Sequence, residues 1–305
     1  MKILKNILLF VMVFGFTTCD MTDLDLQDDP NAVSPDNASI NDLYNRIQLS
    51  FRNVYNGTWG VGGLARMVNL TGGFTYNDVF SPTTFNGIWY NTYSSLIPDI
   101  DALIALDTEG GFGTHTASCK IMKAYTLCAM VDMFGDVPYS EIGQGTNIIS
   151  PGRDGGASIY AAADVLLDEA LTTLESVDVY APADDDIYYG GSRANWATLA
   201  KTLKLRNAVV TKLAGGSGGT VTKIVSDGDF IEDASQDFQF QYGTNRDLPN
   251  SRHWMYNDAY ENSDATYMSN YYMWLLRAEK EDMDGNAVVD PRIRFYFYRQ
   301  NATSI

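Results

Sequence analysis

The chain has 305 residues, 45% of them hydrophobic, and is long enough to bury one large core or two smaller ones. Its formal net charge is −17, and so negative a field repels phosphate backbones, which excludes nucleic acid as a partner. The 19 tyrosines of this acidic chain suit the binding of neutral polar ligands instead.

The amino end is typical of an export signal. Lys2 and Lys5 precede an apolar run at 7–16, and small residues follow it. A spanning helix needs about 20 apolar residues, so a permanent anchor helix is disfavoured and residues 1–18 are expected to be cleaved as a signal peptide. Cys19 stands where a bacterial lipoprotein carries its acylated cysteine, and we expect a lipid anchor there. The alternative is an ordinary cleaved secretory signal.

Residues 19–40 are polar and acidic, contain two prolines and carry little to bury, which predicts an extended tether. A single helical domain is expected over 41–305. Its first helix begins at Ser39 or Asn41 and ends near Gly57. Its apolar residues recur at helical spacing: Leu43, Ile47, Phe51 and Val54.

Glycines and aromatics alternate without a period over 57–86, which predicts a long loop. A second helix starts at Gly87 and should bend or restart at Pro98. The third helix runs from about Thr116 to Met133 and ends at Gly135, because glycine accepts the left-handed conformation of a helix end.

Three further helices are predicted from the apolar period. They begin at Ser158, Asn195 and Ser269, and between the last two the chain is rich in turns. Long amphipathic helices without alternating strands indicate an all-α fold of stacked helix pairs with long irregular loops. The sequence carries no tetratricopeptide consensus, and the helices are irregularly spaced.

The spacing of the cysteines and histidines supports neither a disulfide nor a metal site. Cys119 and Cys128 lie on opposite faces of one helix, about 13 Å apart along its axis, too far for a disulfide. His115 and His253 are far from each other, and neither lies near a cysteine, so no zinc site can form. No metal or other cofactor is expected.

Two acidic segments also fail as metal sites. The segment from Asp282 lacks the glycine and the closing glutamate of an EF-hand. The loop Asp184–Asp186 is expected to be a solvated acidic loop, with weak ion binding as the alternative.

Three segments resemble the SusD/RagB-like outer-membrane nutrient-binding lipoproteins. Residues 123–141, KAYTLCAMVDMFGDVPYSE, resemble that family's helix followed by a Gly-Asp-x-Pro-Tyr turn. Residues 196–206, WATLAKTLKLR, look like a helix of one branch, and DLDLQDDPNAVSP resembles its acidic arm; DPRIRFY at 290–296 is a weaker match. Family members are considerably longer, so the chain is expected to be incomplete at its carboxyl end.

The resemblance implies a tetratricopeptide-like scaffold on the cell surface, lipid-anchored in the outer membrane. It also implies partnership with a SusC-like TonB-dependent transporter and capture of an oligosaccharide, or of a peptide, for import. In this family, Asp136 and Tyr139 in the turn are expected to be structural, and Arg206 to pair with a buried carboxylate or with carbonyls.

Sugar receptors present flat aromatics for stacking and short polar side chains for hydrogen bonds. Trp89, Trp196 and Trp274 are assigned to the core, because their apolar neighbours recur at helical spacing. The loop aromatics and their polar neighbours form the candidate set, although any one aromatic could pack on the scaffold instead. The ligand-binding candidates are Trp59, Phe74, Tyr76, Asn77, Asp78, Asn245, Arg246, Trp254, Tyr256 and Tyr260.

Two other functions remain open. A helical glycoside hydrolase needs two carboxylates at a set separation, and no motif selects a pair among the acids of this chain. A structural or adhesive surface lipoprotein would share the signal, the anchor and the acidity. No nucleophile elbow or ligand cluster supports catalysis, so the protein is not expected to be an enzyme.

Overall fold

The computed structural model describes residues 39–69, 81–215, 218–247, 250–261 and 267–297. All of these residues except Ser39 belong to one compact unit, Ile40–Ile305. The predicted signal peptide, Cys19 and nearly all of the tether lie outside the described residues. Among the residues described, no helix has the length and apolar character needed to cross a membrane.

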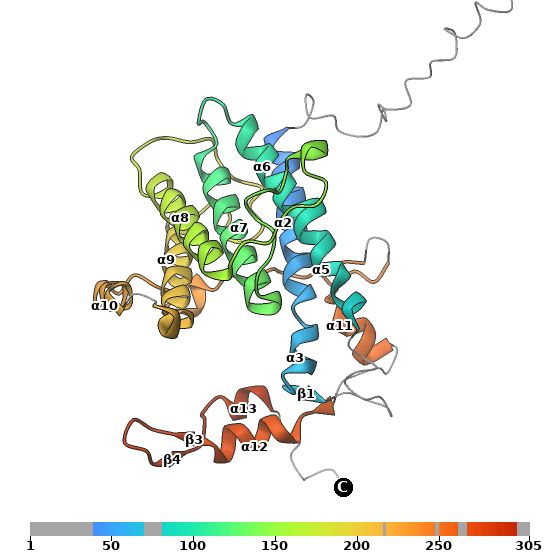
Figure 1. The fold of residues 1–305 in the computed structure, drawn as a ribbon, viewed down its shortest axis with the longest axis vertical. Helices are drawn as coiled ribbons and strands as arrows, with labels where there is room; N and C mark the ends of the chain where they lie inside the picture. The colour runs from blue at the N-terminus through green and yellow to red at the C-terminus, as the bar shows by residue number, and fades with distance from the viewer. Residues whose placement is uncertain (1–38, 70–80, 216–217, 248–249, 262–266, 298–305) are drawn as a thin grey trace, which may run out of the picture. The chain divides into compact units, whose positions relative to one another are not determined.

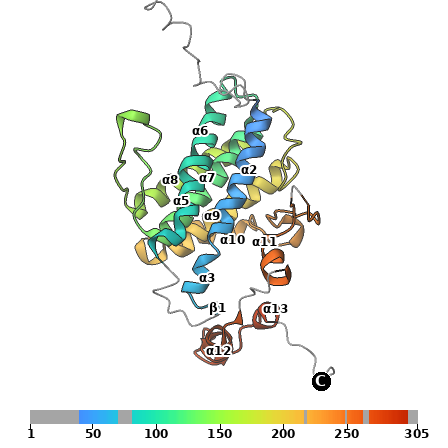
Figure 2. The ribbon, with the colours of Figure 1, turned by 90° about the vertical axis from the view of Figure 1, so that its right-hand side faces the viewer.

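Long helices packed side by side form the body of the unit (Figures 1 and 2). The predicted all-α, tetratricopeptide-like architecture of stacked helix pairs is confirmed, with α7 packed on α8 and α8 on α9. The long helical segments are α2 (Ile40–Gly57), α5 (Asn86–Tyr90) continuing through η2 (Asn91–Leu96) into α6 (Ile97–Leu106), α7 (Gly113–Phe134), α8 (Gly156–Leu174) and α9 (Arg193–Val210).

Short elements follow the helical stack in the chain. The helices among them are α10 (Gly218–Asp227), α11 (Trp254–Tyr256), α12 (Asn270–Ala278) and α13 (Ile293–Tyr296). β1 (Val68–Asn69) pairs antiparallel with β2 (Tyr267–Met268), and β3 (Lys280–Glu281) pairs antiparallel with β4 (Ala287–Val288). The first of these pairs joins the segment after α2 to the segment before α12.

Pro98 restarts its helix as predicted. Proline has no N–H to donate and clashes with the preceding turn, and the turn before it, η2, is a π-helix that ends at Leu96. Pro98 itself occupies the first turn of α6, where its missing N–H costs nothing. The apolar side chains on both sides of this irregular turn, Leu96, Ile97 and Ile100, are buried.

Helix α7 is the central element of the core. Its buried side chains cover more than one face, including Ile121, Leu127 and Met130. Cys119 and Cys128 are both buried and free, as their spacing predicts. Burial raises the pKa of the Cys128 thiol to about 12, so this residue acts as a small apolar side chain.

The turn after α7 is structural, as expected. Gly135 ends the helix with a φ of +76°, a region that disfavours other residues. Oδ1 of Asp136 then accepts a hydrogen bond from the backbone N–H of Gly156, at the start of α8, at 3.0 Å. Oδ2 of Asp154 accepts the N–H of Tyr139 at 2.8 Å. These bonds fix the connection between two stacked helices.

The interpretation of Asp184–Asp186 as a solvated loop is wrong for Asp186. This carboxylate is 5% exposed, and its Oδ2 accepts a hydrogen bond from Nε1 of Trp196 at 2.7 Å. Asp184 and Asp185 are exposed as predicted. The cause is the loop's return toward α9, which carries one of the three acids into the core beside the indole.

The predicted core position of Trp274 is also wrong. Its side chain is 49% exposed, whereas Trp196 is fully buried and Trp89 packs partly buried against the core. Helix α12 lies against the short elements α13, β3 and β4, and the only side chain that it buries is Leu276. Helical spacing alone therefore overstated the burial of this helix.

The segment predicted as a loop over 57–86 contains more regular structure than expected. Helix α3 (Gly60–Leu64), strand β1 and a 3-10 turn, η1 (Pro82–Phe85), lie within it. Residues 70–80 of the same segment are outside the described residues. The glycines of α3 do not prevent helix formation, because neighbouring segments pack against this short turn.

His115 is fully buried, and neither of its ring nitrogens has a partner among the described residues. Its ring packs edgewise on Tyr44 at 4.8 Å and on Phe112 at 5.4 Å between centroids. Burial lowers the pKa of His115 from 6.5, although Asp185, Asp107 and Asp186 oppose this. The imidazole is therefore neutral at pH 7.

A loss of stability is expected below pH 6.5. Below pH 6.5, His115 binds a proton in the unfolded chain. In the folded chain it binds that proton only at a lower pH, because its folded-state pKa is lower. The free energy of unfolding should therefore fall as the pH drops from 6.5 toward 5. In a His115→Phe variant this part of the profile should flatten, measured by urea denaturation at several pH values. If the natural protein and the variant lost the same stability between pH 6.5 and pH 5, His115 would not be the cause of that loss.

Candidate functional site

Trp59, which follows the end of α2 and precedes α3, lines two cavities. The glycines around it permit close packing: a Cβ on Gly57 would lie 3.1 Å from Cβ of Ile88, and one on Gly60 would lie 3.0 Å from the ring of Phe85. The chain therefore runs tightly along η1 and α5. The indole of Trp59 stays 40% exposed.

The first cavity, the polar pocket, has a volume of about 740 Å³. Trp59 and Trp254 meet here edge to face, with centroids 5.5 Å apart and planes at 71°. The ring of His253 stacks on Trp254 at 5.5 Å. The lining residues are Arg52, Asn53, Asn56, Gly57, Trp59, Gly60, Thr84, Phe85, Tyr242, Asn250, Arg252, Trp254 and Asn257.

Four asparagines, two arginines, a threonine and a tyrosine supply the polar side chains of the polar pocket. Nδ2 of Asn56, on α2, donates to the hydroxyl of Tyr242 at 3.0 Å, across 186 positions of sequence. Oδ1 of Asn250 accepts from the backbone N–H of Arg252 at 3.2 Å. Amides both donate and accept, so aromatic faces and amide groups share one cavity here.

A stacked pair of tyrosines lies next to this pocket in the chain. The rings of Tyr256 and Tyr260 are 5.0 Å apart at 29° and are 45% and 77% exposed. The Arg252 guanidinium lies 4.7 Å from the centroid of the Tyr256 ring. Neither tyrosine lines the polar pocket, but the pair extends its aromatic surface from α11.

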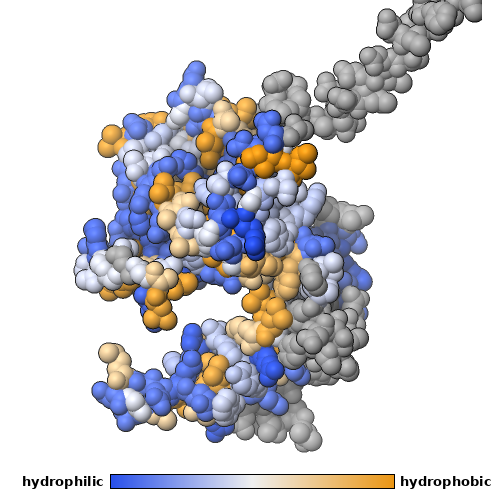
Figure 3. All heavy atoms as spheres, in the orientation of Figure 1, coloured by the Kyte–Doolittle hydropathy of each residue, from blue (hydrophilic) through white to orange (hydrophobic). Residues whose placement is uncertain are grey.

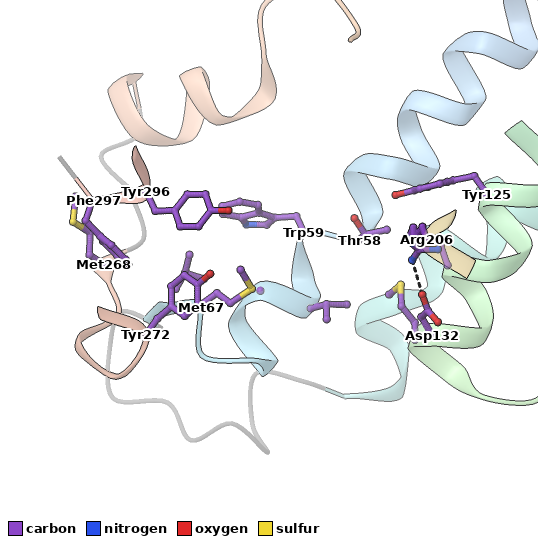
Figure 4. A pocket seen from close by; sticks show the side chains of 15 residues that line it. Thr58, Trp59, Met67, Tyr125, Asp132, Arg206, Met268, Tyr272, Tyr296 and Phe297 are labelled. Carbon is purple, nitrogen blue, oxygen red and sulfur yellow. Dashed lines mark hydrogen bonds and ion pairs between the residues drawn. The ribbon is translucent and has the colours of Figure 1, made fainter. Parts of the chain in front are cut away.

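The second cavity, the aromatic pocket, has a volume of about 650 Å³ and separates α7 and α9 from α12 and α13. Figure 3 shows a hollow on this face with hydrophobic side chains along its border. In Figure 4, Tyr272 and Phe297 lie at one end, and Tyr125 lies at the other near an ion pair. The lining residues are Thr58, Trp59, Val61, Gly62, Met67, Val68, Tyr125, Ala129, Asp132, Met133, Arg206, Met268, Tyr272, Tyr296 and Phe297.

Arg206 pairs with a carboxylate in the aromatic pocket, as expected, but that carboxylate, on Asp132, is exposed and not buried. Its Nη2 lies 2.7 Å from Oδ2 of Asp132, and its guanidinium carbon lies 5.8 Å from the Tyr125 ring. Burial raises the pKa of Tyr125, and the phenol stays protonated. This cavity offers a sugar fewer hydrogen bonds than the polar pocket does, so the polar pocket is the better candidate site.

The structure brings together only part of the candidate set predicted from the sequence. Trp59 and Trp254 share the polar pocket, and Tyr256 and Tyr260 lie beside it. Asn245 and Arg246 line neither cavity; Nε of Arg246 pairs with Oε1 of Glu261 at 3.1 Å. Four candidates, Phe74, Tyr76, Asn77 and Asp78, lie outside the described residues.

Sequence reasoning missed the contribution of α2. Arg52, Asn53 and Asn56 lie on its polar side, while the opposite face buries Ile47, Phe51 and Val54. The two asparagines were the available signal, because this residue type is unfavourable inside a helix. Where the structure describes the chain, no group of three or more His, Cys, Asp or Glu residues could hold a metal ion.

Comparison with known proteins yields one family. A model of SusD-like proteins, described as starch-binding and associating with the outer membrane, matches residues 38–304. Among curated proteins, none matches the sequence.

Several solved structures resemble the fold. A SusD/RagB family protein from Bacteroides thetaiotaomicron is 22% identical, with a TM-score of 0.59 over 73% of this chain and 49% of its own. A SusD homolog from Parabacteroides distasonis is 17% identical, with a TM-score of 0.62 over 82% and 54%. A chitin-binding SusD homolog from Flavobacterium johnsoniae is 22% identical, with a TM-score of 0.50 over 62% and 42%. The chain thus spans about half the length of these structures.

Proposed function

Because the chain belongs to the SusD-like family, described as starch-binding and associating with the outer membrane, we propose that it captures a glycan in the polar pocket without altering its bonds. One observation carries this proposal: the Trp59–Trp254 pair and several amide side chains line one cavity of about 740 Å³. Small-molecule sites have volumes of roughly 300–1,000 Å³ and combine apolar walls with a few polar groups.

The two kinds of side chain suit the two surfaces of a sugar ring. Its C–H face is apolar and packs on an indole, while its hydroxyls exchange hydrogen bonds with amides. Tyr256, Tyr260 and Asn245 would extend the contact along an oligosaccharide, and so would Phe74, Tyr76, Asn77 and Asp78. A peptide is the alternative ligand, bound by the same aromatic surfaces.

The proposal also includes the route to the cell surface. Residues 1–18 would be removed as a signal peptide, Cys19 would carry the lipid, and residues 19–40 would tether the domain 41–305. The domain would deliver its ligand to a SusC-like TonB-dependent transporter. The family's association with the outer membrane supports this arrangement. Fractionation of cells making the natural chain or a Cys19→Ala variant tests it: if the natural chain were soluble, the anchor would be refuted.

Truncation of either pocket tryptophan should weaken ligand binding about thirtyfold. An aromatic anchor in a pocket contributes about 2 kcal/mol, which corresponds to that change in Kd. The experiment compares Trp59→Ala and Trp254→Ala with the natural protein by calorimetry, using the best ligand from a panel of oligosaccharides and peptides.

Trp274→Ala is the matched control, because this exposed tryptophan lines neither cavity. Circular dichroism should show all three variants folded. Unchanged affinity in both pocket variants would refute the site, and a peptide as the best ligand would refute the carbohydrate assignment.

A further inference from the structure

The polar pocket differs in charge from the chain that builds it. The sequence has 38 acidic against 21 basic residues. The residues that line the polar pocket nevertheless include two arginines, Arg52 and Arg252, and no aspartate or glutamate. A cavity for a neutral sugar does not need positively charged side chains. The positive charge of the pocket therefore indicates the charge of its ligand.

Arg52 has hydrogen-bond donors to spare. Its Nε and Nη2 donate to Oδ1 of Asn53 at 3.3 and 2.9 Å, and its guanidinium carbon lies 5.1 Å from the centroid of the Phe240 ring. A guanidinium carries five N–H donors. No carboxylate among the described side chains forms an ion pair with Arg52, so neutral groups hold its guanidinium in place.

Arg252 is only partly neutralised. Its Nη1 donates to Oε1 of Glu261 at 2.9 Å, and Arg246 lies 3.1 Å from the same oxygen. The hydrogen bond from Arg252, with the charge of Arg246, lowers the pKa of Glu261, so the carboxylate stays ionised at neutral pH. Two cations thus share one anion, and this group adds positive charge beside the pocket.

The net charge of the whole chain does not cancel this local field. At physiological ionic strength, exposed charges more than about 8 Å apart are largely screened. An anion in the polar pocket therefore interacts mainly with the arginines around it. From the acidic composition of the chain, a neutral ligand was expected. The two arginines in this cavity favour an anionic ligand instead.

We propose that the polar pocket selects a glycan bearing an anionic group, a carboxylate or a sulfate, which pairs with Arg52 while the sugar ring packs on Trp59 and Trp254. This inference rests on the proposed function and narrows its ligand class. A planar guanidinium fork matches the two oxygens of such an anion, and asparagine amides line the same cavity beside it.

The test compares each acidic glycan with its own neutral form. The purified protein is first screened on an array of neutral polysaccharides such as amylose and chitin, uronate-bearing ones such as galacturonan and alginate, and sulfated ones such as carrageenan. Calorimetry then measures oligosaccharides of the best acidic ligand before and after reduction of the carboxyl groups or removal of the sulfates. This step also distinguishes the two anion sources.

The acidic form is expected to bind roughly tenfold or more tightly than its neutral form, because a hydrogen bond to a charged group contributes about 1.5–3 kcal/mol. Arg52→Gln should remove most of that difference, so that the acidic and neutral forms bind with nearly equal affinity. Raising the salt from about 0.1 M to about 1 M, which shortens the Debye length from about 10 Å to about 3 Å, should weaken only the acidic form. Arg153→Gln is the control, because it removes the same charge from an exposed loop outside the pocket.

Three results would overturn the inference. Equal affinity for acidic and neutral forms, with binding still lost in Trp59→Ala, would refute the anion preference and leave glycan capture intact. An undiminished preference in folded Arg52→Gln would refute the assignment to this pocket. Absence of binding to every polysaccharide on the array would refute the inference together with the proposed function.

Discussion

Replacement of Asp186 by alanine is expected to lower the free energy of unfolding by about 4 kcal/mol, because it leaves several buried N–H groups without an acceptor. Oδ2 accepts from Nε1 of Trp196 at 2.7 Å and from the N–H of Gly191 at 3.0 Å. Oδ1 accepts the N–H groups of Tyr188 and Tyr189 at 3.0 and 3.2 Å. One carboxylate thus joins the loop before α9 to the fully buried indole.

Asp186→Asn should rescue only part of the loss. Its amide nitrogen would face two N–H donors wherever it is placed, because each carboxylate oxygen accepts two hydrogen bonds. Asp184→Ala is the control and should change stability by less than about 0.5 kcal/mol, since this neighbour is exposed. Urea denaturation at pH 7 measures all three. A loss under about 1 kcal/mol in Asp186→Ala would show that the loop finds other acceptors.

Replacement of Arg193 by methionine should destabilise the protein by about 2–3 kcal/mol. The last carbonyls of a helix have no partner within it, and the Arg193 guanidinium binds those at the end of α8 and just after it. Nε donates to the Leu174 carbonyl at 3.1 Å, and Nη2 donates to those of Thr173 and Ser176 at 3.0 and 2.8 Å. The same group lies 4.9 Å from the Tyr180 ring centroid.

Lysine at this position tests the geometry separately from the charge. An ammonium is a point donor and cannot serve several carbonyls in a fork, so Arg193→Lys should recover less than half of the lost stability. Thermal and urea denaturation of both variants provide the measurement. Full recovery in the lysine variant would indicate that charge at the end of α8, and not the fork, stabilises this connection.

The helices could be predicted from the sequence because their signals are local. The 3.6-residue period, the proline at 98 and the glycine at 135 each act within a few residues of their own position. The burial of Ile47 and Trp196 follows from the same period. The GDVPY turn carried the family resemblance for a related reason, since Asp136 bonds to a backbone N–H at the start of the next helix.

Contacts between segments distant in the sequence formed the candidate site and caused the two wrong predictions of burial. Asn56 and Tyr242 meet across 186 positions, and no period in either segment predicts that meeting. Trp274 is exposed although it was expected in the core, and Asp186 is buried although it was expected in solvent. Burial depends on what packs against an element and not on the element's own sequence pattern. Composition determined the sign of the whole chain's charge, whereas only the tertiary structure placed two arginines in the polar pocket. Local sequence specifies backbone conformation, but a cavity is formed by side chains that the fold brings together.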